Sequence, residues 1–331
     1  DQPSYSIILM AMRRAVAICL LGFMAGAEAL AFHPTSANPL PLHAKHQVAK
    51  APMRLRGGGL IKMTISSLAN AGGLVTSAAI VGGMNVVGFA ITALTGTHLV
   101  TDLIGTGSFA ISSIASLLIG HGGGTRALVS TVCITTWSIR LASFLFLRIL
   151  KTKKDARLSE VFSTPFKMML FWFASAMWGF VCLIPHSMLC FQKEEVAMRG
   201  VDWLMTSCFA AGFAIESVAD WQKWIHKRSK ESAHTLCRSG LWSLSRHPNY
   251  FGEILVWTAL CALDASGLRS LNEILLSFLS PAFISWLLIS VSGVPLAEKK
   301  MEKRFGSDED YRLYKANTPL LVPNILKLLR K

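Results

Sequence analysis

The sequence contains few charged residues, and most of them carry one sign. Charged residues make up 16% of the 331 positions, against about 25% in an average soluble domain. Lys and Arg number 33 against 19 Asp and Glu, which gives a formal net charge of +14 at pH 7. Because 52% of the residues are hydrophobic, the composition excludes a disordered chain and a soluble DNA-binding domain. It predicts an all-α, polytopic membrane protein in contact with a lipid bilayer, whose charged residues lie in the loops. No nucleic-acid partner is expected.

Several common site motifs are also absent. There are seven Cys but no C-x-x-C pair, so neither a zinc site nor a redox motif is predicted, and no metal is expected. Most of the Cys lie in apolar runs, where they are expected to be small buried side chains. Neither a G-x-G-x-x-G run nor a Walker A motif follows a strand pattern, which argues against a Rossmann domain and a P-loop.

The first 31 residues have the pattern of a secretory signal peptide. Residues 12–14 are a basic start, and residues 15–27 are an apolar stretch too short for a comfortable membrane span. Ala29-Leu30-Ala31 follows this stretch and has small residues where signal peptidase requires them. We therefore expect residues 1–31 to be a signal peptide.

Residues 32–62 have the composition of a transit peptide. They contain no Asp or Glu, five Lys or Arg, four Pro and a run of three Gly. A signal peptide followed by Phe32 and such a stretch is similar to the bipartite presequence of algae with complex plastids. We therefore expect a plastid membrane, with the endoplasmic reticulum as the alternative, and a membrane domain over residues 63–331.

Seven apolar runs follow, and we expect each to span the membrane. The predicted spans are 74–95, 99–120, 127–150, 166–190, 202–219, 250–266 and 271–291. The loops after the third, fifth and seventh spans contain 19 Lys or Arg, whereas the loops after the second, fourth and sixth contain 4. Because successive loops lie on opposite sides, this asymmetry predicts one consistent topology with a basic cytosolic or stromal face.

The sixth predicted span begins with residues that carry chemistry. Pro248 can start a helix and biases His247 toward an extended conformation. On that helix Asn249 and Glu253 are four residues apart and share a face with Tyr250. A carboxylate near the bilayer is costly without a partner, so we interpret this face as a polar binding site.

Cations precede this helix start. Arg246 and His247 stand where the N-terminal dipole of the helix favours anions, which indicates a ligand carrying phosphate. Arg140 lies inside a predicted span and needs an anionic or carbonyl partner, for which a phosphate is one candidate.

Residues 240–253 read G-L-W-S-L-S-R-H-P-N-Y-F-G-E. This run resembles the C-terminal signature of the steroid 5-alpha-reductase superfamily, and in particular a membrane family of unknown function within it. An A-D-W-Q-K element at 219–223 and a segment at 298–319 are similar to the same family and occur in the same order. The resemblance covers about residues 74–324 and is strongest over 216–323.

The resemblance implies a reductase that binds NADPH at the cytosolic ends of seven helices. It implies hydride transfer to a carbon–carbon double bond of a lipophilic substrate such as a sterol, an isoprenoid or a quinone-like lipid. Asn249 would bind the nicotinamide amide, and Asp220 and Glu253 would bind cofactor hydroxyls or orient Asn249. The residues assigned to phosphate or adenosine are Lys227, Arg246, His247 and Tyr311, with Arg140 as a further cofactor-binding candidate.

The chain departs from the steroid reductases in its early spans. Those enzymes use a Tyr and a Glu there to polarise the substrate carbonyl, but no Tyr occurs in the first five predicted spans of this chain. A steroid substrate is therefore in doubt. The proton donor is left open among Asp102, His186 and Tyr250, of which Tyr250 and Asp102 are our catalytic candidates.

Two alternative functions remain. Isoprenylcysteine carboxyl methyltransferases, which use S-adenosylmethionine, also have an R-H-P-x-Y element and a later acid–Phe-Gly–Tyr–Tyr-Lys segment, but they usually lack the Gly-Glu present at 252–253. The second alternative is a non-catalytic protein of the same fold that binds a lipid.

Overall fold

The computed structural model is all-helical over the part of the chain that it describes, residues 58–97, 99–152, 162–229, 232 and 234–329. The predicted signal peptide and residues 32–57 of the transit-like stretch lie outside the described residues. The first described helix begins at Gly58 and continues through residue 62, before the expected start of the membrane domain. The helices are α2 (Gly58–Thr95), α3 (Thr101–Ile119), α4 (Gly124–Thr152), α6 (Pro165–Cys190), α7 (Gly200–Arg228), η1 (Gly240–Ser243), α8 (Pro248–Ala265), α9 (Leu271–Ser277), α10 (Leu279–Trp286), η2 (Leu287–Val291), α11 (Val294–Phe305), α12 (Glu309–Asn317) and α13 (Leu326–Leu329).

Within the described residues, five helical segments are long and apolar enough to cross a membrane. They are Ala71–Thr95, Thr101–Ile119, Gly124–Lys151, Pro165–Cys190 and Leu271–Phe305. Large apolar side chains point outward from them, among them Leu94 at 86% exposure and Leu118 at 77%. The chain is therefore an integral membrane protein that contacts the lipid bilayer.

The two remaining predicted spans fall on α7 and α8, which are not among these five segments. α7 carries Asp202, Glu216 and Asp220 along its length, and α8 has only 18 residues and begins with Pro-Asn-Tyr. The structure thus confirms the all-α class and has helices long and apolar enough to cross a membrane at five of the predicted spans, whereas seven spans stay a prediction.

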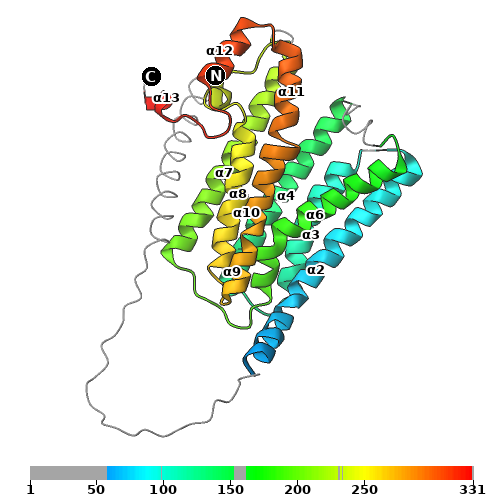
Figure 1. Ribbon diagram of the computed structural model, residues 1–331, viewed down its shortest axis with the longest axis vertical. Helices are drawn as coiled ribbons and strands as arrows, with labels where there is room; N and C mark the ends of the chain where they lie inside the picture. Colours follow the sequence, from blue (N-terminus) through cyan, green and yellow to red (C-terminus); the bar gives the residue numbers. More distant parts are fainter. Residues whose placement is uncertain (1–57, 98, 153–161, 230–231, 233, 330–331) are drawn as a thin grey trace.

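α7 and α8 pack against each other more extensively than any other pair of helices (Figure 1). Their crossing requires glycine: a Cβ on Gly252 would lie 2.7 Å from the backbone N of Glu216 and the carbonyl O of Gly212. α2 and α6 make a similar close approach, where Trp172 lies over Gly88 and donates to Thr92 Oγ1 at 2.8 Å. Small residues at crossings allow this packing where lipid supplies no hydrophobic driving force.

An aromatic cluster fills the middle of the bundle. It consists of Phe109 on α3, Trp137 on α4, Trp178 on α6 and Trp257 on α8, with ring centroids 4.7 to 6.2 Å apart. Trp137 and Trp257 are 0% and 1% exposed. The four rings thus join four different helices in one core.

The last predicted span is built from several segments rather than one regular helix. α9 and α10 are followed by a π-helical turn, η2, and then by α11, which begins at Val294 and has Pro295 in its first turn. Proline lacks a backbone N–H, which explains a break at this point. α11 and α12 then extend beyond the bundle at the same end as the C-terminal part of α7 (Figure 1). We call this end, formed by the C-terminal part of α7, residues 234–247, α11 and α12, the basic end.

Candidate functional site

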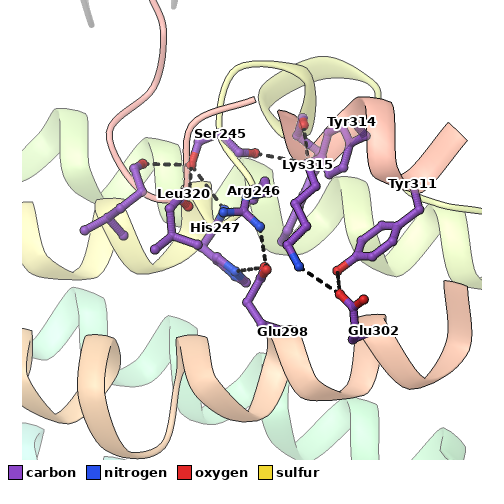
Figure 2. Close-up of polar contacts among 11 residues, drawn as sticks. Ser245, Arg246, His247, Glu298, Glu302, Tyr311, Tyr314, Lys315 and Leu320 are labelled. Carbon is purple, nitrogen blue, oxygen red and sulfur yellow. Dashed lines mark hydrogen bonds and ion pairs between the residues drawn. The ribbon is translucent and has the colours of Figure 1, made fainter. Parts of the chain in front are cut away.

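The loop before α8 is held by the C-terminal segment of the chain. Ser245 Oγ donates to the Leu321 carbonyl at 2.7 Å, and Arg246 N donates to the Pro319 carbonyl at 2.9 Å. Asn324 N donates to the Leu244 carbonyl at 2.9 Å. Hydrogen bonds between residues more than seventy positions apart thus fix the loop that the sequence motif occupies. Figure 2 shows Ser245 beside Leu320.

Arg246 and His247 share one carboxylate partner, Glu298 on α11. Arg246 Nη1 lies 2.5 Å from Glu298 Oε2, and His247 Nε2 lies 2.7 Å from Oε1 (Figure 2). His247 also stacks on Tyr250 with ring centroids 5.3 Å apart. Burial lowers the pKa of His247, while the hydrogen bond to Glu298 opposes that shift.

A cavity of about 170 Å³ opens between α7, the segment 235–247, α11 and α12. Five Lys or Arg line it together with two His, whereas Glu298 is the one carboxylate among the lining residues. The lining cations are Lys223, Lys227, Arg246, Lys300 and Arg304. An excess of positive charge in a concave site favours a ligand with several negative charges.

Lys223 is a partly buried cation of this cavity. Its Nζ lies 4.0 Å from the ring centroid of Trp242, whose indole donates to the Ala219 carbonyl at 3.0 Å. Burial lowers the pKa of Lys223 to about 8, and repulsion by Lys227 adds to the effect. An anion in the cavity would relieve this repulsion.

Tyr311 and Tyr314 close the cavity from α12. Tyr311 OH donates to Glu302 Oε2 at 3.3 Å, and Lys315 Nζ lies 2.8 Å from the same oxygen (Figure 2). Tyr314 OH donates to the Trp242 carbonyl at 2.7 Å, and burial raises the pKa of this phenol. Both phenols therefore fix α12 in place.

A second group of polar residues, which we call the arginine cluster, lies next to the cavity among α4, α7 and α8. Arg140 Nη1 lies 2.8 Å from Glu216 Oε1, and Nη2 lies 2.8 Å from Asp220 Oδ2. Trp137 Nε1 donates to Glu216 Oε2 at 3.0 Å. The anionic partner that Arg140 requires is thus a pair of carboxylates on α7, and no phosphate is needed to neutralise it.

Asn249 joins this cluster from the start of α8. Its Nδ2 donates to Asp220 Oδ1 at 3.3 Å, whereas its Oδ1 is buried and has no hydrogen-bond partner among the described residues. Because a carboxylate paired with Arg140 can only accept, the amide nitrogen of Asn249 must face Asp220. The amide oxygen is left as an acceptor that lacks a donor. Glu253 lies one turn further along the same helix.

The structure brings eight predicted cofactor-binding residues to this end of the bundle. Lys227, Arg246, His247 and Tyr311 line the cavity, and Arg140, Asp220, Asn249 and Glu253 lie in or beside the arginine cluster.

The candidate proton donors lie in different places. Tyr250 stacks on His247 near the cavity. Asp102 faces Arg148, with Oδ2 and Nη2 3.8 Å apart. His186 lies outside this site, hydrogen-bonded to Ser130 at 3.0 Å and to the Ser113 carbonyl at 3.2 Å. Of the three, Tyr250 is closest to the residues expected to hold the cofactor.

Sequence reasoning named Asp220 but missed Glu216, Glu298, Lys223 and Lys300 as residues of the site. Glu216 lies four residues before Asp220, so their shared helical face was readable from the sequence. Glu298 begins the segment 298–319 that resembles the same family, but its pairing with Arg246 and His247 depends on how α11 packs. The contributions of Lys223 and Lys300 to the cavity depend in the same way on tertiary structure.

The chain matches the family described as "Protein of unknown function (DUF1295)" over residues 88–318. No curated protein and no solved structure matches the chain. The match covers more than half of the sequence and includes α3 to α12, with both the cavity and the arginine cluster. This chain therefore belongs to the DUF1295 family.

Proposed function

We propose that the protein is a membrane-embedded reductase that uses NADPH to reduce a carbon–carbon double bond of a lipophilic substrate. The observation that carries the proposal is the cation-lined cavity at the basic end, next to an amide with an unpaired acceptor. The resemblance of residues 216–323 to the steroid 5-alpha-reductase superfamily supports it.

The charge of the cavity favours NADPH over S-adenosylmethionine. NADPH carries a pyrophosphate and a further phosphate, whereas S-adenosylmethionine carries a sulfonium cation beside its amino acid group. Five cations and one carboxylate line the cavity, and such a surface attracts polyanions and repels a sulfonium. Arg246 can also bind a phosphate through its planar guanidinium.

The volume limits which part of the cofactor the cavity can hold. Pockets for whole drug-sized ligands measure roughly 300–1,000 Å³, and this cavity measures about 170 Å³. We therefore assign it to the phosphate-bearing end, with Lys223, Lys227, Arg246 and Lys300 as the phosphate-binding residues.

Asn249 fits the nicotinamide end. Its unpaired Oδ1 can accept a hydrogen bond from a carboxamide N–H, and Asp220 fixes the orientation of its amide. Arg140 in turn holds Asp220 at 2.8 Å. Asp220 and Arg140 thus act as positioning residues, and NADPH supplies the hydride when it is bound.

The reduction adds a hydride to one carbon of the double bond and a proton to the other. Tyr250 is our first candidate for the proton donor, because it lies on the same helix turn as Asn249, and Asp102 is the second. The substrate class, a plastid location and seven membrane spans are part of this proposal.

Calorimetric titration of the purified protein in detergent with NADPH tests the proposal. We expect saturable binding, and a roughly 2- to 12-fold weaker affinity in Asn249→Ala from the loss of one hydrogen bond. Asn317→Ala is the matched control, since Asn317 is an exposed amide on α12 that bonds only the Leu313 carbonyl. A parallel titration with S-adenosylmethionine should show no saturable binding.

Two results would contradict the proposal. Binding of S-adenosylmethionine in place of NADPH would favour the methyltransferase. Binding of neither cofactor, with no NADPH oxidation on addition of a plastid lipid extract, would favour a non-catalytic lipid-binding protein. Lipid analysis of a knockout, by revealing an accumulated unsaturated precursor, would identify the substrate.

A further inference from the structure

Two cations and a tryptophan meet where α4 and α7 end, and none of the three lines the cavity. Lys151 Nζ lies 5.8 Å from the ring centroid of Trp224, and Arg228 Cζ lies 5.4 Å from the same centroid. Both distances are within the range of a cation–π contact. Lys151 belongs to the last turn of α4, whereas Trp224 and Arg228 belong to the last turns of α7. We call these three residues the cation–Trp cluster.

Neither cation of this cluster has a carboxylate partner within the part of the chain that the structure describes, and both are exposed. A helix dipole favours a cation at each helix C-terminus, but it does not require Lys151 and Arg228 to meet at one ring. Two cations brought together without an anion repel each other. An anion that contacts both of them would remove this repulsion.

The cation–Trp cluster lies at the level expected for lipid headgroups. The segment Gly124–Lys151 is one of the five that are long and apolar enough to cross a membrane, and Lys151 is its last residue. The end of such a segment lies at the boundary between the hydrocarbon core and the headgroups, where aromatic and basic side chains are enriched. Since α4 and α7 end at the same end of the bundle (Figure 1), Arg228 lies at this boundary too.

Exposed apolar side chains precede each cation on the same helix face. On α7, Trp221 and Ile225 lie seven and three residues before Arg228 and are 54% and 49% exposed. On α4, Leu147 lies four residues before Lys151 and is 56% exposed. Each helix therefore has an apolar surface on the membrane side of its cation, as expected where an acyl chain lies below a phosphate.

Phe144 connects the cation–Trp cluster to the arginine cluster. Its ring centroid lies 6.3 Å from that of Trp224, and Arg140 Cζ lies 5.4 Å from the Phe144 centroid. A ligand that holds Trp224 in place would therefore stabilise the packing of α4 against α7 beside Arg140.

We propose that the cation–Trp cluster binds the phosphate of an anionic phospholipid through Lys151 and Arg228. The acyl chains lie along Leu147, Trp221 and Ile225. The positive charge of the cluster selects an anionic headgroup over a zwitterionic one, whose own cation offsets its phosphate. A soluble phosphate compound would use only the two cations, whereas a phospholipid also covers the exposed apolar side chains. The site does not depend on the proposed reductase activity.

Native mass spectrometry of the purified protein in an uncharged detergent tests the proposal. The probes are phosphatidylglycerol and phosphatidylcholine with the same acyl chains, and we expect the wild-type protein to bind phosphatidylglycerol more tightly. Each basic residue near an anionic headgroup accounts for roughly a 5-fold change in affinity, so Lys151→Gln/Arg228→Gln should weaken phosphatidylglycerol binding by about 25-fold. Binding of phosphatidylcholine should be nearly unchanged. Equal affinity of the wild-type protein for the two lipids, a measurement that needs no variant, would overturn the proposal.

Lys299→Gln/Lys303→Gln is the matched control. Both lysines are exposed on α11 at the basic end, and neither lines the cavity. This double variant removes the same charge as Lys151→Gln/Arg228→Gln, so a clearly smaller loss of phosphatidylglycerol binding would support the assignment to the cation–Trp cluster. Equal losses would show that the lipid responds only to the net charge of the basic end, which would contradict a specific site.

Inorganic phosphate tests whether the ligand is a lipid or a soluble anion. At matched ionic strength, sodium phosphate should displace no more phosphatidylglycerol than sodium chloride does, because it cannot replace the acyl-chain contacts. Stronger displacement by phosphate would assign Lys151 and Arg228 to a soluble phosphate and overturn the lipid assignment.

Thermal unfolding tests the role of the ring. A ligand that binds only the folded state raises the melting temperature, so phosphatidylglycerol should raise that of the wild-type protein more than phosphatidylcholine does. The difference between the lipids should shrink in Trp224→Leu. It should persist in Trp203→Leu, which removes an exposed tryptophan from the other end of α7. An undiminished difference in Trp224→Leu would place the lipid elsewhere and overturn the proposal.

Discussion

Replacing Arg140 with Met gives a direct test of the arginine cluster. Arg140 binds Glu216 and Asp220 at 2.8 Å each, and the three side chains are 17%, 3% and 13% exposed. Met has a similar length but no charge, so the variant leaves two carboxylates unpaired inside the bundle. Breaking a buried ion pair in this way costs roughly 3–5 kcal/mol. Because Arg140 is partly exposed, we expect about 3 kcal/mol, or a melting temperature about 6–12 °C lower.

Thermal unfolding in detergent, followed by circular dichroism, measures this effect. The matched control is Arg148→Met on the same helix, where the pair with Asp102 is longer, at 3.8 Å, and about a third exposed; it should cost less than about 1 kcal/mol. Adding Glu216→Gln and Asp220→Asn to Arg140→Met should restore part of the loss, because two amides do not repel each other. Equal melting temperatures for Arg140→Met and Arg148→Met would refute the reasoning.

Two further predictions concern the cavity and the α7–α8 crossing. Since the pKa of Lys223 is lowered to about 8, its charge is lost as the pH rises through that value, and calorimetry with 2′,5′-ADP should show weakening affinity from about pH 7 to about pH 9. Lys223→Gln should bind more weakly and show a smaller change over this range; an unchanged pH profile would contradict the role of Lys223. Gly252→Ala places a Cβ 2.7 Å from the backbone of α7 and should cost about 1–3 kcal/mol in thermal unfolding. Gly107→Ala, where nothing lies within 4 Å, should be neutral or slightly stabilising, and equal effects of the two substitutions would argue against the close crossing.

Local patterns along the chain predicted many individual features correctly. Pro248 begins α8 as expected, and Asn249, Tyr250 and Glu253 follow within its first two turns. The described Cys in apolar runs are buried, as their surroundings indicated. These features depend on neighbours in sequence, where helix geometry fixes the relation between residues.

Predictions about span number were less complete. A hydropathy argument identifies a span when apolar residues far outnumber charged ones. α7 contains buried acidic residues, which pair with Arg126 and Arg140 from α4. A hydropathy argument counts each of these acids as an unpaired charge, although ion pairs inside the bundle neutralise them. The number of helices that cross the bilayer therefore depends on partners distant in sequence.

The sequence by itself determined the helical class, the apolar segments, the basic end and the residue types available for a site, because these follow from composition and local periodicity. Tertiary structure alone decided which charges meet. It gave Arg140 a pair of carboxylates on α7, and it directed Glu298 to both Arg246 and His247. The physical reason is that a hydrogen bond requires contact within about 3 Å, and for residues on different helices only the packing of the bundle sets that distance.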